Sequence, residues 1–155
     1  MTRTIGRMGR RTALAFLLVA AFLVQGLAID PARAGDTVQN RAEMLQLTND
    51  DRADRDRDEL RLNDRLSRYA RRHSRQMAER GELFHTPDLA DKLQGTGWSI
   101  GAENVGMGPS LEALEDAFMG SRPHRRNILR AGFERTAIGV FESGGKFWVT
   151  VIFYG

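Results

Sequence analysis

The strongest constraint on the fold is the segment 147–153, a nearly continuous run of apolar, β-branched and aromatic residues. A second run of this kind, residues 136–142, precedes it, and Ser143-Gly144-Gly145 lies between the two. Two such runs across a Gly-Gly turn predict a β-hairpin. Because the second strand has no polar face to turn toward water, helices are expected to cover both faces of the sheet.

Helical periodicity predicts the elements that cover this sheet. Asn63 is a good N-cap and Gly81 a good C-terminal stop for a helix over residues 64–80. His73 lies in the middle of the buried stripe of this helix, and we interpret it as a core histidine with one hydrogen-bond partner. Other expected elements are helices over 38–54 and 110–120, short helical segments at 87–93 and 123–129, and a short strand at 103–107.

The side chains of two groups of charged residues are predicted to face solvent. In the helix over 110–120, the apolar positions 111, 114, 117 and 118 are expected to face the core, which leaves Glu112 and Glu115 toward water. Residues 50–61 alternate acids and arginines with almost no apolar residue. An ionic binding strip is one interpretation of this segment, and a solvated helix end followed by a loop is the favoured one.

The first 34 residues are predicted to be a bacterial export signal. The start is rich in arginine, residues 13–28 are almost wholly apolar, and Ala32-Arg33-Ala34 resembles a signal-peptidase site. An uncleaved membrane anchor is the alternative, but Gln25 and Gly26 shorten the apolar part below the ~20 residues that a span requires. Cleavage is favoured, and it leaves one domain over residues 35–155, secreted or periplasmic.

Removing this leader changes the net charge. The whole chain carries a formal charge of +3, but five arginines and one aspartate lie in residues 1–34, so residues 35–155 carry −1. The remaining arginines are interleaved with acids, and no nucleic-acid partner is therefore expected. The chain has no cysteine, so packing rather than disulfides must stabilise an exported domain.

Three polar residues lie in short segments near turns, where a rigid scaffold can bring loops together: His85, Glu103 and His124. Two imidazoles and a carboxylate are a credible ligand set for Zn²⁺ or another divalent cation, with a fourth position left for a water that the metal would acidify. Without a metal, Glu103 would hydrogen-bond one imidazole and tie a loop to a helix. The sequence leaves both interpretations open, so no cofactor is assigned.

Several motifs occur in a characteristic order along the chain: Leu47-Thr48-Asn49-Asp50-Asp51-Arg52, Ala70-Arg71-Arg72-His73-Ser74, Phe84-His85-Thr86, Gly101-Ala102-Glu103-Asn104-Val105 and the segment from Ser121 to Leu129. Their order and spacing resemble the CAP superfamily (cysteine-rich secretory proteins, antigen 5, pathogenesis-related 1) in its short bacterial SCP-domain form. The resemblance covers about residues 44–154. It implies an α+β fold, an α-β-α sandwich with a small, mainly antiparallel sheet flanked by helices.

The resemblance also implies a cleft that carries two histidines and two acidic residues. His85 and His124 match the histidines, and Glu103 with Asn104 matches the family's Gly-Glu-Asn-type segment. The second acidic residue would fall near Ser121, which helical geometry turns inward. A serine there supplies no negative charge.

Three functions remain open for this chain. The favoured one is a secreted, non-enzymatic binding or interaction module whose cleft recognises a small molecule, a lipid or a cell-envelope component. The alternative is a metal-dependent hydrolase or protease that uses the same cleft, and the third is a structural role at the envelope. Resemblance to this family constrains the expected fold far more than it constrains the identity of the ligand. A monomer without a transmembrane segment after cleavage is expected.

Overall fold

The computed structural model describes residues 31–155, with side chains from residue 38 onward. The predicted leader lies mostly outside the described residues, and its cleavage stays a prediction. The first helix, α1 (Pro31–Ala53), starts earlier than the predicted position 38 and before the expected cleavage point at Ala34. Proline suits a first helical turn because it needs no N–H partner there. Within residues 31–155, no helix has the length and apolar content that crossing a bilayer requires.

Four strands form one sheet in the order β1-β3-β4-β2: β1 (Arg61–Leu62), β2 (Gly101–Gly108), β3 (Arg135–Ser143) and β4 (Lys146–Tyr154). β3 and β4 are the predicted hairpin, whose turn glycines Gly144 and Gly145 have φ values of 60° and 69°, which glycine adopts without steric cost. β2 pairs antiparallel with β4, whereas β1, which the sequence did not predict, pairs parallel with β3. The prediction of a mainly antiparallel sheet is confirmed.

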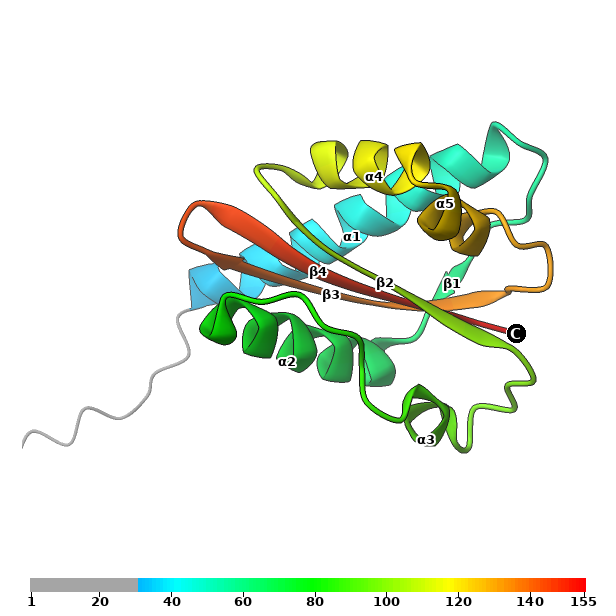
Figure 1. Cartoon of the computed structure of the whole chain (residues 1–155), viewed down its shortest axis with the longest axis horizontal. Helices are drawn as coiled ribbons and strands as arrows, with labels where there is room; N and C mark the ends of the chain where they lie inside the picture. The colour runs from blue at the N-terminus through cyan, green and yellow to red at the C-terminus, as the bar shows by residue number, and fades with distance from the viewer. Residues whose placement is uncertain (1–30) are drawn as a thin grey trace, which may run out of the picture.

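Helices cover both faces of this sheet, as predicted (Figure 1). α1, α4 (Leu111–Gly120) and α5 (Arg122–Ile128) lie on one face, and α2 (Asp64–Arg80) with the short α3 (Leu89–Leu93) lies on the other. Alternating side chains of the hairpin enter two cores. Ile138, Val149, Val151 and Phe153 belong to the core beneath α1, and Ala137, Ile152 and Tyr154 to the core beneath α2. The predicted α-β-α sandwich is therefore confirmed.

α2 begins and ends where the sequence predicts. The Asn63 side chain accepts a hydrogen bond from a first-turn backbone N–H at 3.0 Å, and Gly81 closes the helix with a φ of 66°. The helix backbone touches Gly139 of β3 directly, because a Cβ added there would lie 2.1 Å from the Ala70 carbonyl carbon. The Ser74 hydroxyl donates to the Gly139 carbonyl at 3.0 Å. A residue without a side chain thus sets the spacing between α2 and the sheet.

The favoured interpretation of residues 50–61 as a solvated segment is wrong for Arg52. Residues 53–59 are exposed, but Arg52 is fully buried at the end of α1. Its guanidinium donates to four backbone carbonyls, those of Asp58, Ile128, Arg130 and Phe133. Burial lowers the pKa of Arg52, and the carbonyl oxygens replace the water that the cation loses. An arginine among acids gives no local sign of such a role.

The buried stripe of α4 also differs from the predicted one. Leu111, Leu114 and Phe118 are buried as expected, but Ala117 is exposed and Glu115 is only 3% exposed. α4 packs against both α1 and β2, so its buried surface is wider than one apolar face. The prediction that Glu115 faces solvent is therefore wrong.

Glu115 lies in a poorly solvated place at the contact between α4 and α1. Among the described residues, neither of its carboxylate oxygens has a hydrogen-bond partner, and the same holds for the Thr48 hydroxyl on α1. Burial raises the pKa of Glu115 to about 8, and the charge of Asp51 acts in the same direction. The folded protein therefore favours the protonated form of this side chain.

We expect Glu115→Gln to make the protein less sensitive to alkaline pH. Because the folded-state pKa lies above the ordinary value of 4.5, the contribution of Glu115 to stability should be fully present below pH 4.5 and be lost as the pH rises toward 8. The variant should therefore be more stable than the wild type at pH 8, by on the order of 1–3 kcal/mol, and similar to it at pH 4. Urea unfolding across this pH range, with exposed Asp116→Asn as control, measures the difference. Parallel pH profiles for wild type and Glu115→Gln would contradict the prediction.

Candidate functional site

The centre of the site is a contact between His85 and Glu103. His85 lies in the segment after α2, and its Nδ1 atom is 2.8 Å from Oε2 of Glu103 on β2. The Glu103 side chain is 3% exposed, whereas that of His85 is 66% exposed. A buried carboxylate thus orients an imidazole ring that is largely open to solvent.

Thr86 completes the hydrogen bonding of Glu103. Its backbone N–H donates to Oε2 at 2.9 Å, and its hydroxyl donates to Oε1. Both carboxylate oxygens are therefore engaged, and the segment 84–86 is tied to β2. The sequence did not predict a role for Thr86, because a threonine beside a histidine carries no signal of its own.

Phe84 and His73 support this segment from the α2 side. Their rings meet edge to face with centroids 4.9 Å apart, and His73 is 2% exposed. His73 Nδ1 lies 3.1 Å from Thr150 Oγ1, and Nε2 has no partner among the described residues. Burial lowers the pKa of His73, which favours the neutral ring. The prediction of a core histidine with one hydrogen-bond partner is confirmed.

His124 approaches the same region from α5. Its ring is half-buried and packs against Phe118 of α4, with centroids 5.2 Å apart. Burial lowers the pKa of His124, and the charge of His85 acts in the same direction. The two predicted cleft histidines are therefore close enough for the charge of one to affect the other.

Two asparagines join β2 to α5. The Asn104 side chain, which is fully buried, donates to the His124 carbonyl at 3.2 Å. The Asn127 side chain donates to Asn104 Oδ1 at 2.9 Å. These bonds fix the strand that carries Glu103 relative to the helix that carries His124. Asn104 thus acts on the site by positioning backbone.

Ser121 lies at the junction of α4 and α5, where the resemblance implies a second acidic residue. It is half-buried rather than turned fully inward, and its side chain makes no capping hydrogen bond to α5. Glu115 does not replace that acid, because it lies toward Thr48 and Asp51 of α1. Neither Ser121 nor Glu115 therefore adds a second carboxylate to the one supplied by Glu103.

The predicted zinc set of His85, Glu103 and His124 stays a prediction. Across residues 38–155, no three His, Cys, Asp or Glu side chains form a group that could hold a metal ion. Glu103 also directs both oxygens to His85 and Thr86. Glu103 does bind one imidazole, but the contact ties the segment after α2 to strand β2 rather than to a helix, as the sequence suggested.

We expect Glu103→Gln to destabilise the protein by about 1–3 kcal/mol, because an amide NH₂ would meet donors where the carboxylate now accepts. The loss should be local to the segment 84–86, so the backbone N–H of Thr86 should exchange with solvent faster. Urea unfolding and hydrogen exchange measure the two effects. Glu82→Gln, an exposed change in the same segment, is the matched control. Equal stability of the two variants would show that the Glu103 contacts do not stabilise the fold.

Solved structures share this architecture. An extracellular SCP-domain protein from Bacillus anthracis has a TM-score of 0.67 and 23% identity, with 81% of this chain and 44% of that protein covered. A cysteine-rich secretory protein from Staphylococcus aureus has a TM-score of 0.61 and 20% identity, with 76% of this chain and 38% of that protein covered. An outer surface protein from Borrelia burgdorferi has a TM-score of 0.60 and 16% identity, with 81% of this chain and 95% of that protein covered. The fold is therefore that of the SCP-domain class.

The sequence comparison makes the assignment more specific. The sequence model of the cysteine-rich secretory protein family, CAP, matches residues 45–153, and the chain belongs to this family. The Bacillus subtilis protein YkwD is 29% identical over 109 residues, which are 66% of this chain and 42% of YkwD. The chain thus spans less than half the length of YkwD and of the Bacillus anthracis and Staphylococcus aureus proteins.

Proposed function

We propose that this CAP-family chain is a secreted or periplasmic bacterial binding module without enzymatic activity, whose cleft takes a small molecule, a lipid or a cell-envelope component. The observation that carries the proposal is the pair of hydrogen bonds to the Glu103 carboxylate. It accepts from His85 at 2.8 Å and from the Thr86 N–H at 2.9 Å. A buried carboxylate held by several hydrogen bonds is fixed in position. It is well placed to orient the exposed ring of His85.

The exposed part of His85 supports a role in recognition. Because Nδ1 is bound to Glu103, Nε2 is the ring atom left for a ligand, as an acceptor in the neutral ring and a donor in the charged ring. Leu83, two residues earlier, is 44% exposed. The segment after α2 therefore offers an apolar side chain and a polar ring edge together, which fits a ligand with adjoining apolar and polar groups.

A metal-dependent hydrolase is not part of this proposal. Its ligand set would need His85, Glu103 and His124 around one ion, and the side chains of residues 38–155 form no such group. The chemistry that the site supports is the binding and orientation of a hydrogen-bonding ligand.

Two comparisons support the proposed location. The Bacillus anthracis relative is described as extracellular and the Borrelia burgdorferi relative as an outer surface protein. The basic and apolar start of this chain, which predicts an export signal, agrees with the same location.

An array of bacterial phospholipids and muropeptides, probed with the mature protein, tests the proposed function. We expect at least one compound to bind, and His85→Ala to weaken that binding by about tenfold, which is the loss of one hydrogen bond to a charged or polar ligand group. His124→Ala should weaken it as well. Gln94→Ala, an exposed change next to α3, is the control.

The outcome can contradict the proposal in two ways. Binding that survives both histidine changes, with the fold intact by circular dichroism, would place recognition outside this cleft. Turnover of an arrayed compound that disappears in His85→Ala would assign an enzyme activity to the site.

A further inference from the structure

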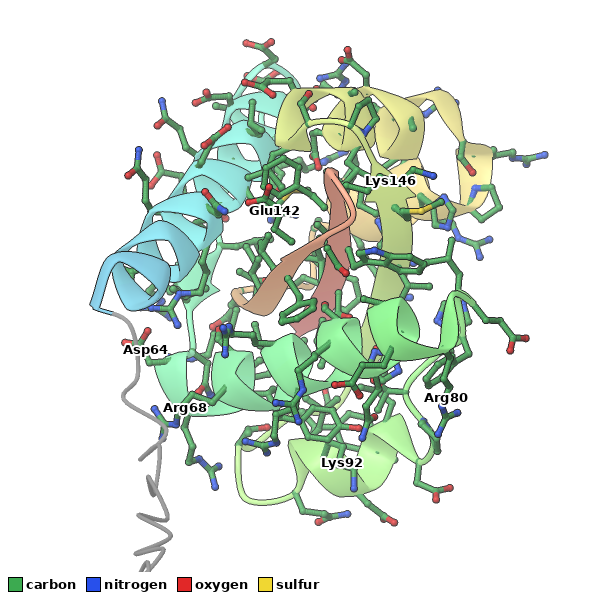
Figure 2. All side chains as sticks on the ribbon, turned by 90° about the vertical axis from the view of Figure 1, so that its left-hand side faces the viewer. Asp64, Arg68, Arg80, Lys92, Glu142 and Lys146 are labelled. Atoms are coloured by element: carbon green, nitrogen blue, oxygen red, sulfur yellow. The ribbon has the colours of Figure 1, made fainter. Side chains whose placement is uncertain are left out.

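α2 carries far more positive charge than the rest of the domain. Its 17 residues include six arginines and two acids, whereas residues 35–155 together carry a net charge of −1. The sequence-based expectation that arginines are interleaved with acids is therefore wrong for this helix. Figure 2 shows α2 with Arg68 near its first turn and Lys92 on α3 beneath it.

A pocket of about 200 Å³ lies between α2 and α3, on the sheet face opposite α1, α4 and α5. Arg65, Leu66, Tyr69 and Arg72 of α2 line it together with Lys92 of α3. Arg65, Tyr69 and Arg72 are spaced four and three residues apart, so they share one side of the helix. Three cations from two helices therefore surround one small opening with an aromatic and an aliphatic wall.

Tyr69 holds two of these cations in place. The Arg72 guanidinium carbon lies 5.8 Å from the Tyr69 ring centroid, and the Lys92 ammonium nitrogen lies 5.3 Å from it. Contacts of this kind attract a cation to the face of an aromatic ring. They keep two positive charges near one ring although those charges repel each other. An anion between them would remove that repulsion.

Acidic side chains do not neutralise the pocket. Among the described residues, Arg65, Arg72 and Lys92 take part in no ion pair, because the two acids of α2 are engaged elsewhere. Asp64 pairs with Arg41 at 3.1 Å and Glu79 with Arg75 at 3.3 Å. Asp91, the one acid of α3, is not among the lining residues. The positive charge of the pocket is therefore available to a ligand.

We propose that this pocket binds a phosphate group whose attached alcohol rests on Leu66 and Tyr69. Arginine forks and a lysine ammonium are the side chains that recognise phosphate oxygens in proteins. The volume is below the roughly 300 Å³ at which drug-sized pockets begin, so it suits a phosphate with a short alcohol. Glycerol phosphate has this chemistry both as a free ester and as the head group of phosphatidylglycerol.

This site is separate from the proposed binding site around His85 and does not rest on the proposed function. No pocket-lining residue is among the cleft residues. His85→Ala should therefore leave phosphate binding unchanged, and a pocket variant should leave cleft binding unchanged. Repeating the array with Arg72→Gln/Lys92→Gln removes phospholipid binding at this pocket from the result, so the two proposals can fail independently.

Calorimetric titration of the mature protein with inorganic phosphate and with glycerol 3-phosphate tests the free ester as the source. Flotation with phosphatidylglycerol vesicles, compared with phosphatidylcholine vesicles, tests the lipid head group. We expect saturable binding in at least one arm, and a loss of about tenfold or more in the double variant Arg72→Gln/Lys92→Gln.

Two further variants separate the pocket from diffuse surface charge. Arg75→Gln removes one positive charge from α2 outside the pocket lining and should change affinity by less than about twofold. Arg72→Lys/Lys92→Arg keeps the charge of the pocket and should keep most of the binding. Thermal melts verify that each variant is folded, and Lys92→Gln alone replaces the double variant if that protein unfolds.

The possible results decide the proposal. Binding of glycerol 3-phosphate that falls in the pocket variant supports a free phosphate ester, and vesicle binding alone with the same loss supports a lipid head group. The proposal is overturned by the absence of saturable binding at ligand concentrations on the order of 10 mM in both arms. It is equally overturned if Arg75→Gln weakens binding as much as Arg72→Gln/Lys92→Gln does.

Discussion

Replacing Arg52 with methionine is expected to lower the free energy of unfolding by about 3–5 kcal/mol. The Arg52 guanidinium donates to the carbonyls of Asp58 and Ile128 at 2.7 and 2.6 Å, and to those of Arg130 and Phe133 at 3.2 Å. Methionine keeps an unbranched apolar stem but has no donor, so it leaves buried acceptors without these partners. Urea unfolding measures the loss.

The position of these carbonyls explains why the expected effect is large. They belong to the loop after α1, the end of α5 and the connection to β3, so one side chain joins three separate segments. Arg52→Lys should recover only part of the loss, because a single ammonium cannot reproduce the directions of a guanidinium fork. Arg57→Met, an exposed change in the same loop, should stay within about 0.5 kcal/mol of the wild type. An unfolding midpoint of Arg52→Met equal to that of Arg57→Met would refute this account.

Gly139→Ala is expected to destabilise the protein by at least about 3 kcal/mol, or to prevent folding. The added Cβ would lie 2.1 Å from the Ala70 carbonyl carbon and 2.2 Å from the Arg71 nitrogen. Both atoms belong to the α2 backbone, so no side-chain rotation can relieve the clash. α2 would have to move away from the sheet, which would also break the bond from the Ser74 hydroxyl to the Gly139 carbonyl.

Gly120→Ala is the matched control for this prediction. A Cβ at Gly120, the last residue of α4, would meet no atom within 4 Å, so the same change should be neutral or stabilising by up to about 1 kcal/mol. Urea unfolding compares the two variants, and near-ultraviolet circular dichroism reports on aromatic packing such as that of buried Trp148. Similar stability of Gly139→Ala and Gly120→Ala would mean that α2 does not pack this closely on β3 in solution.

The sequence predicts the elements whose signals are local. Asn63 and Gly81 mark the ends of α2, and the two apolar runs around Gly144-Gly145 mark the hairpin. β1 was missed because it has two residues and forms only by pairing with β3. The burial of Arg52 and Glu115 was missed for a related reason. The environment of a charged side chain depends on segments that pack against it from elsewhere in the chain.

The candidate site is predictable in part. The histidines and the carboxylate were found from their segments, and the family resemblance placed them in one region. The hydrogen-bond partners were not found, because the role of Thr86 depends on the approach of one segment to β2 within 3 Å. The basic pocket was missed because its cations are gathered by the packing of α3 against α2, and α3 has only five residues.

The strand order has a consequence for folding during synthesis and export. β4 lies between β3 and β2, and Gly101 at one end of β2 pairs with Tyr154. β2 therefore emerges from the ribosome or the export channel well before its neighbour exists, and this long-range pairing makes assembly slow. Until the chain has been delivered through residue 154, β2 exposes unpaired backbone groups to which other polypeptides can pair.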